Sequence, residues 1–190
     1  MTSATQILRR EHDTILGVIG SLEAAVQRIE AGEAIPVNVL NGFIDFFVLF
    51  ADRSHHGKEE DLLFPMMERK GVPRSGGPLG CMLAEHDEGR ACIRAMKENA
   101  EGCAQGATTA RQGWTAAARG YATLLRNHIW KENEILFQIA ERLLSSEEQA
   151  ALAGQFARIQ QEKLDQETEA RLSDFARKVA REFATVAAAT

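Results

Sequence analysis

The sequence contains few prolines, cysteines and aromatic residues. Its 190 residues include only 4 prolines and 3 cysteines, and aromatic residues make up 6%. Together with 45% apolar and 26% charged residues, so few prolines argue against disorder and are typical of a soluble folded domain. The cysteines form no C-x-x-C pair and recur every 11 residues, so we interpret them as free thiols in a reducing compartment: Cys81, Cys92 and Cys103.

Long apolar runs and basic runs are also missing. The longest apolar stretch, residues 43–51, is far too short to span a bilayer. The first ten residues lack the apolar segment of a signal peptide. The net charge of −5, with no run of lysine and arginine, argues against a nucleic-acid partner. We therefore expect a cytoplasmic protein with neither a membrane nor a nucleic acid as partner.

Helical periodicity is what the sequence does contain. Four segments carry apolar residues at three- and four-residue steps, which is the pattern of amphipathic helices, and no segment reads as a convincing strand. These segments cover residues 3–31, 36–69, 78–102 and 108–144. Gly32 ends the first, and the Gly/Pro cluster of residues 70–80 predicts a loop, either a flap over one end of the helices or a plain connection. The fold class we expect is all-α, an up-down four-helix bundle.

The character of the chain changes after residue 144. Ser145 or Ser146, followed by two glutamates, resembles a helix N-cap with an acidic first turn. Apolar residues then follow at helical spacing: Leu152, Phe156, Ile159, Leu172, Phe175, Val179 and Phe183. We expect residues 1–144 to form the bundle domain. Residues 145–190 would add one or two helices that pack on the bundle or pair two chains as a homodimer.

Two halves of the chain repeat one another. The tripeptide Glu-His-Asp at His12 recurs at His86, and the string HHGKEEDLLF from His55 recurs as HIWKENEILF from His128. Within each half the two motifs lie one helix, a turn and most of a second helix apart. The repeat predicts two helical hairpins of similar design, which together supply the four helices.

Each predicted helix aims one histidine at the core. His12, His55, His86 and His128 all fall in step with the apolar residues of their own helices. For His55 and His128 these apolar neighbours include Val48, Leu62, Met66 and Ile135. A single buried histidine is commonly satisfied by a backbone carbonyl, but four such histidines, one per helix, would each need a partner in an apolar interior.

Two of these histidines carry a glutamate four residues later, Glu59 and Glu132. This spacing places both side chains on one helix face, within the apolar stripe. Because a buried carboxylate is costly unless it is paired or binds a metal, the pattern favours a metal site. Imidazole and carboxylate donors suit iron, and also manganese or zinc. Neither an H-E-x-x-H nor an E-x-x-H motif occurs, and the number of donors suits two ions bridged by carboxylates.

The second histidine of the HHGKEE string leaves an alternative open. His56 and Glu60 share the four-residue spacing of His55 and Glu59, but the repeat aligns His55 and Glu59 with the second half without a gap. His56 either reaches a metal from beside His55 or forms a hydrogen bond with Asp52. Glu60 is the weaker candidate as a ligand, since the second half has an asparagine in its place.

This pattern of histidines and glutamates, with Leu-Phe following in both halves, resembles the hemerythrin-like, or HHE cation-binding, proteins over residues 5–144. The resemblance implies a four-helix bundle that holds two non-haem irons, with an oxo or hydroxo bridge, and binds dioxygen. It implies His12, His55, His86 and His128 as ligands and Glu59 and Glu132 as bridges. Oxygen-carrying members place a further histidine where this chain has Arg90, and His56 would restore the total of five.

Three functions follow as expectations. The first is dioxygen binding for sensing, storage or delivery, and the second is an enzyme acting on peroxide, nitric oxide or oxygen. The third is iron handling. Dioxygen binding needs an apolar pocket, and its candidate lining is Phe47, Phe50, Leu125 and Trp130. Tyr121, two turns before His128, is a ligand, a proton donor or a core residue.

Overall fold

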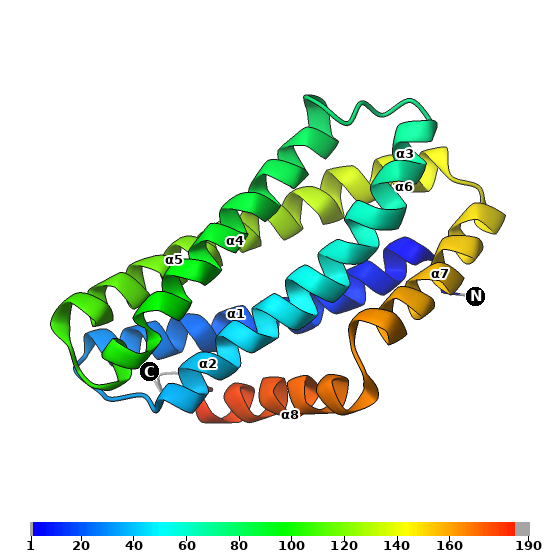
Figure 1. Ribbon diagram of the computed structural model, residues 1–190. Coiled ribbons are helices and arrows are strands. Elements are labelled where there is room, and N and C mark those ends of the chain that lie inside the picture. The colour runs from blue at the N-terminus through cyan, green and yellow to red at the C-terminus, as the bar shows by residue number, and fades with distance from the viewer. Residues whose placement is uncertain (1, 185–190) are drawn as a thin grey trace, which may run out of the picture.

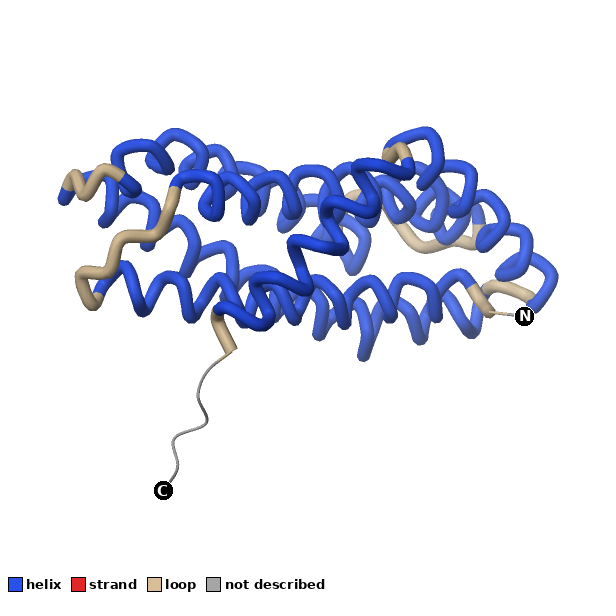
Figure 2. Tube along the Cα trace, turned by 90° about the horizontal axis from the view of Figure 1, so that it is seen from below, coloured by secondary structure: helices blue, strands red, loops and turns tan. Residues whose placement is uncertain are grey.

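Four helical rods lie side by side and alternate in direction in the computed structural model, which describes residues 2–184 (Figure 1). The first rod is α1 (Ala4–Glu30), and the third is α4 (Gly77–Ala104). The second rod joins α2 (Val37–Asp45), η1 (Phe46–His56), η2 (Glu59–Leu63) and α3 (Phe64–Arg69). The fourth joins α5 (Thr108–Lys131), η3 (Glu132–Leu136) and α6 (Phe137–Leu143). Helices α7 (Ser146–Lys163) and α8 (Gln166–Glu182) follow. The described residues contain no strand, so the all-α prediction is confirmed (Figure 2).

The helix ends follow from local side-chain chemistry. Ser3 begins α1 with a capping box that pairs it with Gln6, and Ser145 begins α7 in the same way with Glu148. Gly32 ends the first rod in the left-handed region, at a φ of 97°, which glycine adopts without steric cost. Both the predicted stop and the predicted cap at residue 145 are thereby confirmed.

The loop predicted over residues 70–80 is too long. The second rod ends at Arg69 and α4 begins at Gly77, so the connection is residues 70–76. Pro78 stands in the first turn of α4, where a missing backbone N–H costs nothing. The Gly/Pro cluster therefore contains the start of a helix as well as a loop. A flap function of residues 70–76 stays a prediction.

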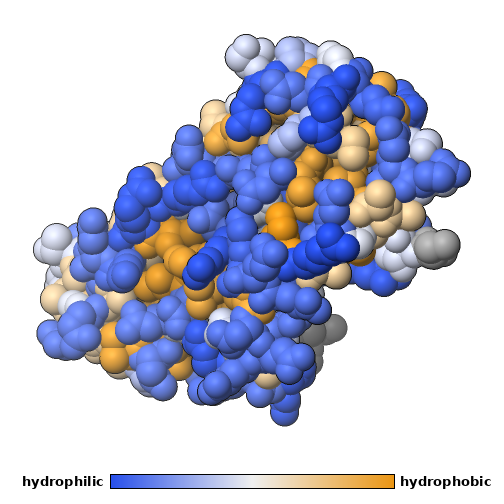
Figure 3. Space-filling view, turned by 45° about the vertical axis from the view of Figure 1, so that its right-hand side comes forward, coloured by the Kyte–Doolittle hydropathy of each residue, from blue (hydrophilic) through white to orange (hydrophobic). Residues whose placement is uncertain are grey.

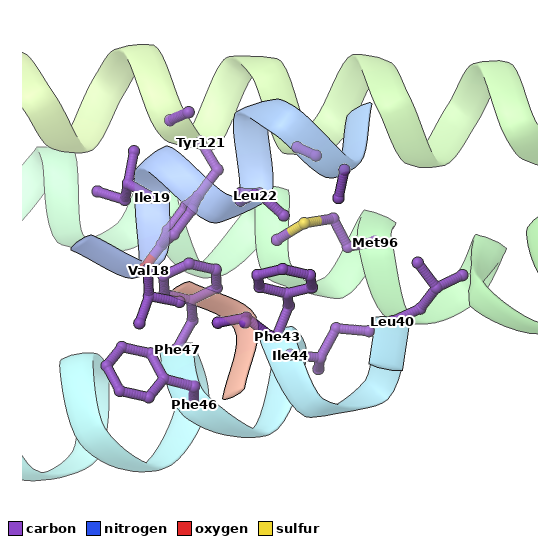
Figure 4. Close-up of a cluster of buried hydrophobic side chains, with 14 of the residues drawn as sticks. Val18, Ile19, Leu22, Leu40, Phe43, Ile44, Phe46, Phe47, Met96 and Tyr121 are labelled. Atoms are coloured by element: carbon purple, nitrogen blue, oxygen red, sulfur yellow. The ribbon is translucent and has the colours of Figure 1, made fainter. Parts of the chain in front are cut away.

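A polar layer divides the core into two apolar clusters. The cluster near the start of α1 contains Leu8, and the larger cluster further along the bundle contains Ile15. His12 lies between these two residues on the same helix and is fully buried. Figure 4 shows part of the larger cluster, where side chains of α1, α2, η1, α4 and α5 meet. The bundle thus holds its buried polar residues between two layers of hydrophobic packing.

Helices α7 and α8 lie along the groove between the first and second rods. Their buried apolar residues join both clusters: Leu152 and Phe156 the cluster of Leu8, and Leu164, Leu172, Val179 and Phe183 the cluster of Ile15. Burial of each such side chain contributes about 1.5–3 kcal/mol, so these helices add substantially to stability. A division of the chain at residue 144 and a homodimer through these helices stay predictions.

The predicted stripe of core-facing apolar residues is wrong by one residue after Glu59 and after Glu132. Ile135 is 46% exposed, whereas Leu136 is 1% exposed. In the first half Leu62 is only half-buried and Leu63 is buried. The reason is that η2 and η3 are π-helical, with wider turns that displace each following side chain by one position. Val48, inside η1, is also exposed. Further along the rods the same shift buries Met67 and Ala140 in place of Met66 and Ile139.

Hydrophilic side chains cover most of the face that Figure 3 shows, with smaller apolar patches between them. Among residues 2–184, no helix combines the length and the hydrophobicity needed to cross a membrane.

Replacement by alanine should have opposite effects on the free energy of unfolding at two helical glycines, Gly42 and Gly17. A Cβ at Gly42 in α2 would overlap the ring of Phe175 in α8, which packs edge-on against Phe43 with ring centres 5.3 Å apart. Gly42→Ala is therefore expected to lower the free energy of unfolding by about 1–3 kcal/mol, as overpacking does. Gly17 in α1 has nothing within 4 Å, so Gly17→Ala should raise it by about 0.5–1 kcal/mol. Urea unfolding followed by circular dichroism measures both, and equal effects would contradict the packing of α8.

Candidate metal centre

All seven predicted donors lie in the polar layer and point inward from the four rods. Each of the five histidines and two glutamates is at most 5% exposed. The donors come from every rod: His12 from α1, His55 and His56 from the end of η1, Glu59 from η2, His86 from α4, His128 from α5 and Glu132 from η3. Residues as far apart in sequence as His12 and Glu132 thus meet at one place.

The donor atoms form two groups, each suited to one metal ion. One group, the two-histidine group, contains His12, His55, Glu59 and Glu132. The other, the three-histidine group, contains His56, Glu59, His86 and His128. Within each group the donor atoms lie within 4.8 Å of one another. Glu59 belongs to both groups.

Each glutamate lies between histidines of the two groups. The Glu59 oxygens are 3.6 Å from His55 Nε2 and 3.7 Å from His86 Nε2. The Glu132 oxygens are 3.1 Å from His12 Nε2 and 3.3 Å from His128 Nε2. Both carboxylates therefore span the two groups, which is the arrangement needed for a bridge between two ions.

The outward nitrogens of two histidines are held by acidic residues of the same half. Glu11 lies 2.8 Å from His55 Nδ1, and Glu85 lies 2.9 Å from His128 Nδ1. Both glutamates belong to the repeated Glu-His-Asp motif. A bond at Nδ1 fixes the ring orientation and leaves Nε2 free to face inward, as in most histidine metal sites.

The outward nitrogens of two more histidines are held across the halves. His86 Nδ1 lies 2.7 Å from Glu60, and His12 Nδ1 lies 2.9 Å from Asn133. Glu60 and Asn133 are equivalent positions of the repeat, so the two contacts are related in the same way. Glu60 therefore orients a candidate ligand from outside, while His56 Nδ1 faces Asp52 at 3.3 Å. The structure thus shows the predicted contact of His56 with Asp52, and His56 as a metal ligand stays a prediction, which its place in the three-histidine group permits.

Lysines complete the surroundings of the two outer glutamates. The Lys58 ammonium contacts Glu11 and also donates to Gln160 of α7, at 2.9 Å, and its side chain is buried. The equivalent Lys131 contacts Glu85 but remains partly exposed. Helix α7 thus covers this side of the centre in the first half of the repeat.

Unpaired polar atoms inside the layer show that the donor set fits a metal. Within residues 2–184, both oxygens of Glu59, both oxygens of Glu132 and Nε2 of His12 have no hydrogen-bond partner. In addition, the Nε2 atoms of His86 and His128 face each other at 3.1 Å. A buried carboxylate without partners costs several kcal/mol, and coordination would satisfy all these atoms together.

Burial and neighbouring charges together set the pKa values of the buried donors. Burial and the neighbouring Glu132 raise the pKa of Glu59 well above its usual value. Burial also acts to raise the pKa of Glu132, but the charge of His128 and contacts with His12 hold that pKa well below the usual value. Burial lowers the pKa of His55 to about 4. Without metal, one carboxyl of the pair therefore tends to keep its proton.

The predicted pocket lining is only partly right. Trp130 is 60% exposed and points away from the core, because the fourth rod turns that face to the outside. Phe47 and Leu125 are buried, and Phe50 is half-buried. Tyr121 is a core residue whose ring packs on Phe47 at 4.6 Å between centres (Figure 4).

Sequence reasoning named Asp52 as a partner of His56 but missed the other outer partners and the π-helical turns. Glu11 and Glu85 were visible as the constant glutamate of the repeated tripeptide, which offered a signal. Two of the π-helices, η2 and η3, begin at a glutamate donor, Glu59 and Glu132, and η1 ends at His56. Such turns are frequent at functional sites, but nothing in the periodicity marks them.

Fold and site together define a metal-binding four-helix bundle with histidine and carboxylate donors. The hemerythrin HHE cation binding domain matches residues 3–140, and the chain belongs to this family. No solved structure gives a significant match.

Three similar curated proteins carry the same name. The iron-sulfur cluster repair protein YtfE of Enterobacter sp. (strain 638) is 29% identical over 139 residues, and that of Cronobacter sakazakii is 30% identical over the same length. The protein of this name from Escherichia coli O139:H28 is 28% identical. Each match covers 69% of this chain and 61% of the relative, so the chain matches less than two thirds of their length.

Proposed function

We propose that the chain holds two non-haem irons and binds dioxygen or another small diatomic ligand at them. The observation that carries the proposal is the placement of both glutamates between histidines of the two donor groups, with none of the four oxygens in a hydrogen bond. His12, His55, His56, His86 and His128 would be the terminal ligands, and Glu59 and Glu132 the bridges. Two irons held in this way would supply the electrons that dioxygen or nitric oxide takes up.

The donor count supports an open position for a small ligand. With both carboxylates bridging, the two-histidine group offers four donors to its ion and the three-histidine group offers five. Iron commonly accepts six donors, so the ion beside His12 and His55 would have more room for an added ligand. Apolar rings from the cluster of Leu8 lie against both donor groups, since Phe137 stacks on His12 and Phe64 on His86. Such rings exclude water and admit a small uncharged molecule.

Iron handling is the second candidate, and the relatives favour it. The names of the similar proteins refer to repair of iron-sulfur clusters. A protein in that role would give up or accept iron rather than hold a diatomic ligand. Manganese or zinc would suit the same donors chemically, but neither would bind dioxygen reversibly in this setting.

Metal analysis tests the proposal directly. Protein purified from iron-replete cells is expected to contain about two irons per chain, and removal of iron should lower the melting temperature, because metal binds only the folded chain. A reproducible single zinc per chain would overturn the two-iron proposal. With reduced protein, an optical change on adding dioxygen that reverses under vacuum supports ligand binding. Transfer of iron to an apo iron-sulfur protein, without that reversible change, supports iron handling.

A further inference from the structure

Arg90 gathers three carboxylates beside the centre. It lies on α4, one turn after His86, with its guanidinium partly exposed. Its Nε lies 2.9 Å from Asp52, its Nη2 lies 2.5 Å from Glu60, and its Nη1 lies 2.9 Å from Asp87. The first two carboxylates come from the second rod, so one side chain ties α4 to that rod.

Two of these carboxylates also hold candidate ligands. Asp52 faces His56 Nδ1, and Glu60 faces His86 Nδ1. The rings of His56 and His86 stack with centres 3.8 Å apart and planes 12° apart. Arg90 is therefore connected, through one carboxylate each, to two of the three histidines in the three-histidine group.

We infer that Arg90 is a positioning residue for the ion of the three-histidine group, an inference that rests on the proposed two-ion centre. Asp52 and Glu60 would repel each other without a cation between them. The contact from Asp52 to His56, at 3.3 Å, is the longest of the five Nδ1 contacts, so it is the one least able to hold its ring unaided. The planar guanidinium matches two carboxylates with fixed geometry, which a lysine ammonium does not.

The two-histidine group does not depend on Arg90. His12 is held by the neutral Asn133, and His55 is held by Glu11. The cation beside Glu11 is Lys58, which is buried and anchored to α7. Loss of Arg90 should therefore affect one ion much more than the other. A residue that only stabilised the fold would weaken both ions together.

Anaerobic titration of the metal-free full chain with Fe²⁺ tests this inference. The wild type is expected to bind two ions, and Arg90→Gln should keep one at wild-type affinity while the other weakens by about 10- to 100-fold, the usual effect of losing an outer partner. Arg90→Lys should fall between the two. Arg126→Gln is the matched control, because Arg126 makes a comparable two-bond contact with Glu23 on the surface. The melting temperatures of the metal-free variants should agree.

The outcomes separate the two proposals. Arg90→Gln with two ions at wild-type affinity would overturn the inference and leave the two-ion centre intact. Equal weakening of both ions, or a melting temperature of metal-free Arg90→Gln well below that of Arg126→Gln, would also overturn it. A wild type that binds a single ion would overturn both proposals.

Discussion

Replacing Glu59 by glutamine is expected to reduce bound iron from about two ions to one or none per chain, without lowering the stability of the metal-free protein. Glu59 is the donor shared by both groups, so its loss removes a ligand from each ion. An amide oxygen is a much weaker ligand than a carboxylate and does not neutralise the charge of two metal ions. Effects on metal binding of this size are the largest we expect from one substitution.

Although Glu59→Gln should bind less iron, the stability of its metal-free form should be unchanged or higher. In the metal-free chain, burial and the nearby Glu132 disfavour the charged form of Glu59, as its raised pKa reflects. Glutamine has the same shape, carries no charge and can donate a hydrogen bond to the Glu132 carboxylate. Since an isolated buried carboxylate destabilises a fold, metal-free Glu59→Gln should melt at or above the wild-type temperature.

Glu23→Gln provides the control for this experiment. Glu23 is a partly exposed glutamate of α1 that pairs with Arg126 on the surface, where an ion pair contributes little. This variant should bind two irons and melt within about 2 °C of the wild type, because surface substitutions usually stay within about 0.5 kcal/mol. Iron content by mass spectrometry and melting by circular dichroism measure both variants. Glu59→Gln that retained two irons would remove Glu59 from the ligand set.

The second large effect is expected at the C-terminal helices. Leu172→Ala in α8 should lower the free energy of unfolding by about 2–5 kcal/mol, the usual cost of removing a buried leucine side chain. Leu172 is 1% exposed and belongs to the larger apolar cluster together with Leu40, Phe43 and other residues of the first and second rods. The loss is a large share of the 5–15 kcal/mol that typical domains possess.

Leu143→Ala is the matched control, since it makes the same change at a leucine that is 36% exposed near the end of α6. Its free energy of unfolding should change by about 0.5 kcal/mol or less. Urea unfolding of the metal-free chains separates this effect from metal binding. If both leucines gave the same small change, α8 would not pack on the bundle as described, and its apolar stripe would be free to pair two chains.

The extent of the four rods was predictable because helix signals are local. Apolar spacing, the cap at Ser145 and the stop at Gly32 all act within a few residues, and each lies where the sequence placed it. The errors came where a helix changes its pitch. The stripe that predicted Ile135 as a core residue assumed an unbroken α-helix, and the π-helical turn at Glu132 displaced the buried position to Leu136.

Most donors of the candidate site were also predictable, because their pattern is local. An imidazole and a carboxylate four residues apart share a helix face whatever the surrounding fold, and the repeat supplied this pair twice. Six polar residues in step with apolar stripes had to meet in the interior, and they do. His56, which the periodicity did not place there, is buried beside them. Trp130 shows the limit of such reasoning. It was predicted to line an apolar pocket because of its residue type and not because of helical periodicity, and its side chain is exposed.

By itself, the sequence of this chain determined that four histidines and two glutamates enter the core and that they are metal-binding in type, because both depend on spacing along single helices. Only the tertiary structure decided which histidines share an ion and what holds each ring. His12 meets Asn133 across 121 residues, and Arg90 meets Asp52 across 38. Those contacts depend on how two hairpins pack against each other, a relation between helices that no periodicity within one helix contains.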